Sequence, residues 1–322
     1  MDKLSSGNSR HKMLNPVFHV QLQNEDDSKL SEALIKSVRK TGQLNLSGLG
    51  LASVPTQMLS MYENDVDKDL DISKTPEDPW WQFSPLTHLD LSSNVIQTLP
   101  PGIVLFGDLT TLNLQDNCLK ELPAGIGGFN KLTMLNVSRN NITILPEELC
   151  RLSELRQLFI AHNKLENLTG DIGDLVMLEV LDLSNNSLTT LPPSISFLIR
   201  LVELNVADNN LVELPPEMTG MRSLSKLIVT NNKLKYVPEL SYMHKLQIIY
   251  AQRNSILALP IFVHSENLQE LHFGSNNIKE VTKDFCDNMA HLKVLDLGDN
   301  EIAILPNEIA FCQSLVPIKF NK

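Results

Sequence analysis

The sequence predicts an α/β solenoid: a curved stack of repeats with a parallel sheet on its concave face and helical or 3₁₀ turns on its convex face. Three observations lead to this fold class. A leucine recurs at steps of 22 to 24 residues from Leu86 to Leu315. The first half of each repeat alternates between apolar and polar residues, which is the period of a strand. The second half has apolar residues three apart, which is typical of a short helical turn.

The strand half is clearest in the unit "LEVLDLSNNSLTTLPPSISFL", which runs from Leu178 to Leu198. Alternation sends Leu181 and Leu183 inward and leaves Asp182 outward. Ten full units of the form LxxLxLxxNxLxxLPxxIxxL run from Leu86 to Ser314. Because each unit contacts only its neighbours, a chain of 322 residues can bury a continuous core without forming one large globule.

An asparagine occupies the ninth position of every full unit. An amide both donates and accepts hydrogen bonds, so it can satisfy backbone groups where the chain turns inward. We therefore interpret these residues as a structural ladder and not as a binding site. They are Asn94, Asn117, Asn140, Asn163, Asn186, Asn209, Asn232, Asn254, Asn276 and Asn300.

A proline opens the outer half of most units and imposes an extended entry. Apolar residues such as Ile195 and Leu198 then follow three apart. Thr169 and Thr282 replace the proline in two units, and we expect altered outer turns there. Helical turns outside and strands inside differ in width, which predicts curvature. The off-length units from Leu246 to His291 are expected to disturb that curvature locally.

Residues 29–55 predict an N-terminal helical cap followed by a degenerate first repeat. In "SEALIKSVRKTG", Ser31 can cap a short helix whose apolar face includes Val38, and Gly42 can end it. The stretch "GQLNLSGLGLASVP" keeps the leucine spacing, but Leu49 stands where the other units have asparagine. This cap would cover the apolar edge of the stack. Residues 1–28 are polar and aperiodic, which predicts a disordered tail.

An insertion over residues 56–85 separates this cap from the ten repeats. Residues 63–78 hold seven acidic residues and two lysines, which is typical of a solvated loop; the alternative is an electrostatic contact with a basic partner. Trp80 and Trp81 follow, where the insertion joins the first full unit. We interpret them as a plug that buries at least one indole, with an exposed binding anchor as the alternative.

Composition argues against nucleic acid and membrane as partners. The formal net charge is −11, whereas phosphate binding needs a basic surface. No stretch approaches the roughly 20 apolar residues of a membrane span, and no signal peptide is evident near Met1. Cys118, Cys150, Cys286 and Cys312 lie far apart in sequence. We expect them to be reduced thiols in packed positions of a cytoplasmic or nuclear protein.

The sequence does not predict an enzyme. The histidines are dispersed, and neither a nucleophile beside a base nor a phosphate-binding loop is present. A solenoid also seldom encloses the water-excluding pocket that catalysis favours. We therefore expect no catalytic residue, cofactor, metal site or small-molecule substrate.

The outward strand positions are the best candidates for binding a protein partner, because the rest of the repeat is committed to the core. Apolar side chains interrupt an otherwise polar and acidic face, and basic side chains flank them. This mixture is typical of interaction hot spots, although single exposed apolar residues can also simply pack on cross-strand neighbours. The candidate partner-binding residues are Phe159, Ile228, Tyr250, Arg139, His162, Lys226 and Arg253.

From about Leu34 onward the chain resembles the intracellular leucine-rich repeat family that includes Ras-signalling scaffolds and Scribble-type polarity proteins. The resemblance implies an intracellular, repeat-only protein without enzymatic activity and does not define a molecular role. Our leading hypothesis is a scaffold, in signal transduction, that holds an intracellular protein partner on its concave face. The alternative is an architectural assembly component that uses the acidic insertion or the outer turns. Members of the family continue through more repeats, whereas this chain stops within a unit, at residues 315–322. We therefore expect a truncated array with an uncapped edge that promotes self-association.

Overall fold

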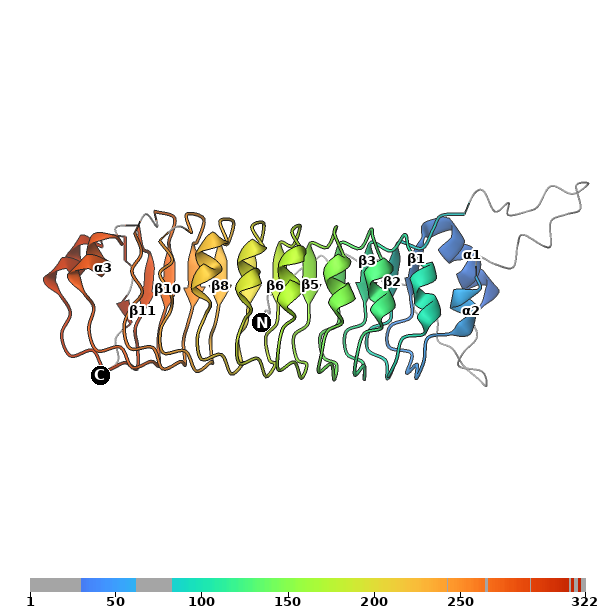
Figure 1. Ribbon diagram of the computed structural model, residues 1–322, viewed down its shortest axis with the longest axis horizontal. Helices are drawn as coiled ribbons and strands as arrows, with labels where there is room; N and C mark the ends of the chain where they lie inside the picture. Colours follow the sequence, from blue (N-terminus) through green and yellow to red (C-terminus); the bar gives the residue numbers. More distant parts are fainter. Residues whose placement is uncertain are drawn as a thin grey trace, which may run out of the picture.

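The computed structural model describes residues 30–61, 83–241, 243–263, 266–289, 291–312, 314–315 and 318–319. Within them the chain forms one sheet of 12 parallel strands that follow one another in sequence order from β1 to β12. Figure 1 shows the units as a single row, with α1 and α2 at one end and α3 near the other. The predicted solenoid is confirmed.

Each strand is short, and those from β2 to β11 occupy the third to fifth positions of their units. The central residue of every strand from β1 to β11 is buried, and its neighbours on either side are partly or fully exposed. The strands are β1 Gln43–Asn45, β2 His88–Asp90, β3 Thr111–Asn113, β4 Met134–Asn136, β5 Gln157–Phe159, β6 Val180–Asp182, β7 Glu203–Asn205, β8 Lys226–Ile228, β9 Ile248–Tyr250, β10 Glu270–His272, β11 Val294–Asp296 and β12 Ile318–Lys319.

The core is a set of leucine ladders that runs the length of the stack. Leu181 pairs with Leu204 across β6 and β7, and both side chains are fully buried. Leu183 is fully buried in the same core. Burying a leucine contributes about 1.5–3 kcal/mol, so the repetition of these positions supplies most of the driving force for stacking.

The conformation of the outer half of a unit depends on the number of residues in that unit. Every unit of 23 residues has a 3₁₀ turn: η2 Pro101–Leu105, η3 Ala124–Gly128, η4 Glu147–Arg151, η5 Gly170–Asp174, η6 Pro193–Phe197, η7 Pro216–Gly220 and η8 Asn307–Phe311. The unit of 24 residues that starts at Leu268 has the α-helix α3, Lys283–Asp287. The units of 22 residues that start at Leu224 and Leu246 have no helix among the residues that the structure describes.

The expectation that a threonine in place of the proline alters the outer turn is therefore wrong at Thr169. Its backbone has the φ of −60° and ψ of 143° that the prolines also adopt, and its Oγ1 accepts a hydrogen bond from the Asp171 N–H at 3.4 Å. The turn at Thr282 does differ, because the extra residue of its unit allows an α-helix, which the Thr282 Oγ1 caps by accepting from the Phe285 N–H at 3.3 Å.

The asparagines of the ninth position join each unit to the one before it. Asn117 Nδ2 donates to the Leu114 carbonyl of its own unit at 3.1 Å and to the Leu91 carbonyl of the preceding unit at 2.9 Å. Its Oδ1 accepts from the Ile96 N–H at 3.0 Å. One side chain thus satisfies buried backbone groups on two units, a demand that neither a purely accepting nor a purely donating side chain could meet.

The N-terminal segment forms the helix α1, Glu32–Thr41. Ser31 Oγ accepts from the Leu34 N–H at 3.2 Å, and Gly42 ends the helix with a φ of 65°. A second short helix, α2 Thr56–Leu59, follows the first repeat. β1 pairs in parallel with β2, so the degenerate unit belongs to the sheet. Asn94 of the next unit accepts from the Leu49 N–H at 3.1 Å. Leu49 can replace asparagine because, in the described residues, the helix α1 and not another repeat precedes this unit.

Several predictions made from the sequence lie outside the described residues. These are the disordered tail, the acidic stretch 63–78 and the Trp80–Trp81 pair; of the last eight residues, only Leu315 and the strand β12 are described. No helix among the residues that the structure describes is long and apolar enough to cross a membrane. The four cysteines are free thiols, and Cys150, Cys286 and Cys312 are buried.

Candidate protein-binding face

Three of the outward residues in the fifth position lie side by side on neighbouring strands. Ile228 on β8 is in register with Tyr250 on β9, and Tyr250 is in register with His272 on β10. The Tyr250 and His272 rings stack with their centroids 4.6 Å apart and their planes 19° apart. All three side chains are half-buried, so each presents part of its surface to a partner. His272 was not among the sequence candidates, although its place next to Tyr250 in the repeat register could have identified it.

Carboxylates at the third position of β7 and β10 flank this cluster. Lys226 Nζ forms an ion pair with Glu203 Oε1 at 2.8 Å, and His272 Nε2 lies within hydrogen-bond distance of Glu270 Oε2, at 3.1 Å. A partly exposed pair of this kind contributes at most about 1 kcal/mol to stability. The main effect of the Lys226–Glu203 pair is on charge, because Glu203 offsets the positive charge of Lys226 that the sequence analysis counted on this face.

Phe159 does not belong to this cluster. It lies on β5, and the polar Asp182 on β6 and Asn205 on β7 separate it from Ile228. At about 4.8 Å between parallel strands, Phe159 is roughly 20 Å from Tyr250. The structure therefore divides the predicted apolar surface into an isolated half-buried aromatic residue and a contiguous group on β8 to β10.

The eighth position of the unit is a turn residue, and the prediction that it faces outward along the strand is wrong. In all ten full units this residue has a positive φ, between 54° and 58°. Arg139, His162 and Arg253 are exposed, but they lie beyond the ends of β4, β5 and β9. The degenerate unit has Gly48 at the same point, with a φ of 68°. A left-handed residue here turns the chain away from the sheet and toward the buried asparagine that follows.

Arg253 lines a shallow pocket of about 280 Å³ next to the aromatic cluster. The glycines Gly274 and Gly298 at the seventh position leave this space open, and Asp296 and Asp299 contribute carboxylates. Asp296 Oδ1 accepts from the Gly298 N–H at 3.1 Å. Asp296 is also the register partner of His272, so the pocket and the cluster form one surface. We call this surface the β8–β11 patch: Ile228, Tyr250, His272, Asp296, Arg253 and Asp299.

The β8–β11 patch offers an apolar edge, a stacked aromatic pair and two carboxylates against one guanidinium. Those groups suit a protein segment that carries an apolar side chain and a basic one. No group of three or more His, Cys, Asp or Glu residues that could hold a metal ion occurs in the described part of the chain.

Three family models match the chain. A leucine-rich repeat region matches residues 143–258, a leucine rich repeat model matches residues 107–165 and 266–319, and another matches residues 84–98. Together they match well over half of the 322 residues, and each match falls on the stacked units.

Solved structures show the same architecture. A leucine-rich repeat protein of Leptospira interrogans is 24% identical with a TM-score of 0.59, over 91% of this chain and 87% of its own. A chain of an octameric complex of latrophilin 3, Unc5D and the leucine-rich repeats of FLRT2 matches with 23% sequence identity and a TM-score of 0.66, over 86% of this chain and 80% of that one. A TDR receptor matches with 23% sequence identity and a TM-score of 0.72 over 89% of this chain, and the match covers only 49% of the receptor chain. At these identities the likeness shows the fold.

Proposed function

Because the chain belongs to the leucine-rich repeat family, we propose that it is a non-catalytic scaffold that binds a protein partner on its concave face, at the β8–β11 patch. The Tyr250–His272 stack, in register with Ile228 and Asp296, is the observation that carries this proposal. In the units before β8 the same column is mostly Asp and Asn. An aromatic centre within a polar surround is the composition of interface hot spots.

Fold relatives support this proposal by analogy. The leucine-rich repeats of FLRT2 are part of an octameric complex with latrophilin 3 and Unc5D. A plant peptide hormone receptor, RGFR1, was solved in complex with RGF2. The likeness of these repeats to the present chain supports a surface that recognises proteins, with the partner's identity set by the outward residues of this chain.

Site-directed photo-crosslinking tests the proposed face. A photoreactive residue at Ile228 or Tyr250 should capture a partner covalently in cells, and the same residue at the exposed Ile144, far from the patch, should not. Tyr250→Ala should abolish the crosslink from Ile228, whereas Phe159→Ala should preserve it. Equal crosslinking from Ile144, or insensitivity to Tyr250→Ala, would exclude the patch as the interface.

We propose that the protein acts in the cytoplasm or nucleus, in signal transduction; its thiols and its resemblance to intracellular scaffolds support this proposal. Cys150, Cys286 and Cys312 are buried and unpaired, which suits a reducing compartment. The stretch from Arg39 to Pro55 together with the Trp80–Trp81 pair further resembles leucine-rich repeat-containing protein 40. Microscopy of the tagged chain tests the compartment, and a lumenal or secreted location would contradict it.

An architectural role through the outer turns is the second candidate, and exposed apolar residues favour it. Phe197 is 63% exposed, Ile199 54% and Val176 48%, all on the outer halves of two consecutive units. Under this alternative Phe197→Ser would disrupt an assembly that Tyr250→Ala leaves intact. Deletion of residues 63–78 tests the acidic insertion in the same assay.

A further inference from the structure

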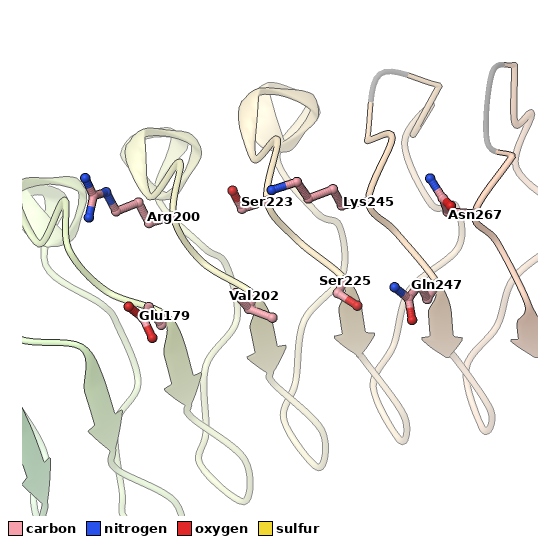
Figure 2. Close-up of a pocket in the computed structure, with 8 residues that line it drawn as sticks. All are labelled: Glu179, Arg200, Val202, Ser223, Ser225, Lys245, Gln247 and Asn267. Atoms are coloured by element: carbon pink, nitrogen blue, oxygen red, sulfur yellow. The ribbon is translucent and has the colours of Figure 1, made fainter.

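A second pocket lies at the edge of the sheet where the outer turns lead into the strands. It has a volume of about 580 Å³, and the segments preceding β6 to β10 line it. We call it the rim pocket: Arg200, Ser223, Ser225, Lys245, Gln247 and Asn267. Figure 2 shows Arg200, Ser223, Lys245 and Asn267 as an upper row near the outer turns, with Ser225 and Gln247 below them just before the strands. It shares no lining residue with the pocket of the β8–β11 patch.

Hydrogen-bond donors dominate the rim pocket. Neither Arg200 nor Lys245 forms an ion pair with a carboxylate among the residues that the structure describes. Glu179 is the only acidic residue of the lining, and the Arg156 guanidinium already holds it, with Nη1 2.9 Å from Glu179 Oε1. The pocket is thus a positive site on a chain whose net charge is −11.

The backbone N–H groups just before the strands already have partners, so side chains would bind a ligand there. The Ser225 N–H donates to the Val202 carbonyl at 2.9 Å, and the Gln247 N–H donates to the Ser225 carbonyl at 2.8 Å. The Ser223 and Ser225 hydroxyls stand between the two cations, and the Gln247 amide lies beside Lys245. Asn267 Nδ2 donates to the His244 carbonyl at 2.7 Å, which holds the far wall in place.

The spacing of the cations suits one oxyanion attached to a chain. Arg200 and Lys245 stand two units apart, about 10 Å at the strand spacing, with Ser223 between them. Lys245 extends toward Ser223, whereas Arg200 extends away from it in Figure 2 and would turn toward Lys245 to share a ligand with it. An arginine fork and a lysine on opposite sides of a phosphoryl group would share its charge of about −2, whereas a carboxylate offers only −1. Val202, which is 44% exposed, gives the lining an apolar surface for the residue next to the phosphoryl group.

From these contacts we propose that the rim pocket binds a phosphorylated serine or threonine in an extended segment of a partner protein. Arg200 and Lys245 hold the phosphoryl oxygens, and the Ser223 and Ser225 hydroxyls and the Gln247 amide complete the donor set. The site does not rest on the proposed function of the β8–β11 patch, because different side chains on another edge of the sheet form it.

NMR titration of the isotope-labelled full chain tests this proposal. The probes are a short alanine peptide with a central phosphoserine, its unphosphorylated and glutamate counterparts, and inorganic phosphate. We expect saturable shifts at the Ser223, Ser225 and Gln247 amides with the phosphopeptide only. Arg200→Gln/Lys245→Gln should weaken this binding at least about tenfold, because it removes both charge-assisted contacts. The control Lys131→Gln/Lys164→Gln removes the same charge from elsewhere on the chain and should change it little.

Each other outcome overturns a part of the proposal. Equal binding of the glutamate peptide would show that the pocket accepts any carboxylate and does not require a phosphoryl group. Equal binding of inorganic phosphate would show that the partner segment contributes nothing to binding. An equal loss of phosphopeptide binding in the control variant would show that the peptide is held only by non-specific electrostatic attraction to the chain. The β8–β11 crosslink at Ile228 should persist in Arg200→Gln/Lys245→Gln, so the failure of one site is distinguishable from failure of the other.

Discussion

The asparagine ladder should be the most sensitive polar element of the fold, and Asn186→Leu tests it directly. Asn186 is 9% exposed. Its Nδ2 donates to the carbonyls of Ile160 and Leu183, each at 3.0 Å, and its Oδ1 accepts from the Leu165 N–H at 3.0 Å. Leucine has a similar size but can form none of these bonds.

The expected loss follows from the groups that leucine would leave without partners. One buried N–H loses its partner, at about 2–3 kcal/mol, and three carbonyls, those of Ile160, Leu183 and Ser184, each lose one bond at about 1 kcal/mol because they have a second lone pair. Burying the leucine side chain returns about 1.5–3 kcal/mol. We therefore expect Asn186→Leu to lower the free energy of unfolding by about 2–4 kcal/mol, a large share of the total for an ordinary domain.

Urea unfolding followed by circular dichroism measures this loss. Hydrogen exchange locates it, because the Leu165 amide should lose its protection while the Leu119 amide, held by Asn140 in a distant unit, keeps it. Asn254→Leu is the matched comparison: Asn254 makes the same bonds but is partly exposed, so water can replace its side chain at a smaller cost. An Asn186→Leu variant within about 0.5 kcal/mol of the parent, or one no worse than Asn254→Leu, would refute the reasoning.

Three further predictions concern single side chains. His162 has a φ of 55°, so His162→Val should lower stability by about 1–2 kcal/mol in thermal unfolding, whereas His162→Asn should be nearly neutral; equal effects would contradict the strain. Ser194 Oγ is buried without a partner in the described structure, so Ser194→Ala should raise stability by up to about 1 kcal/mol, whereas Ser196→Ala loses a hydrogen bond to Pro193 and should not. Burial, reinforced by nearby carboxylates, raises the pKa of the Cys150 thiol from 9.0 to about 12. The thiol of the unfolded chain ionises at a lower pH than the buried thiol. The stabilisation that comes from burying the neutral thiol is therefore complete below about pH 9 and is lost as the pH rises toward 12. The difference in free energy of unfolding between the parent and Cys150→Ala, measured by urea titration, should shrink over that range, and a constant difference would contradict this reasoning.

The leucine spacing predicted the strands and their register because burial leaves a period-two segment only one way to face the core. Leu181 and Leu183 therefore pack as expected, and Ser31 and Gly42 bound α1 by local chemistry alone. The outer turns were harder to predict. Proline and threonine adopt the same extended backbone at that point, as Thr169 shows, so the length of the unit, and not the residue, decides whether a helical turn forms.

The binding face was only partly predictable. Stacking of Tyr250 on His272 depends on side-chain rotamers that the repeat does not specify. The turn at the eighth position was visible in Gly48 and in the Asn and Asp residues that five of the ten full units have there, but Arg139 and Arg253 obscure it, because arginine is not typical of a left-handed backbone. The sequence could not reveal the rim pocket, since its residues stand outside the consensus and become neighbours only when units stack.

The two candidate surfaces occupy shared units but opposite ends of their strands. Arg200 and Lys245 precede β7 and β9, at the edge where the strands begin, whereas Asp296 and Asp299 lie where β11 ends. Tyr250 and His272 end β9 and β10 in the same register row as Asp296, so the aromatic pair lies on the acidic edge. A partner that crossed both surfaces would therefore meet a cationic edge where the strands begin and an aromatic and acidic edge where they end. A segment with a phosphoryl group at one end and an apolar and a basic residue at the other would match this order, and the reverse orientation would place like charges together.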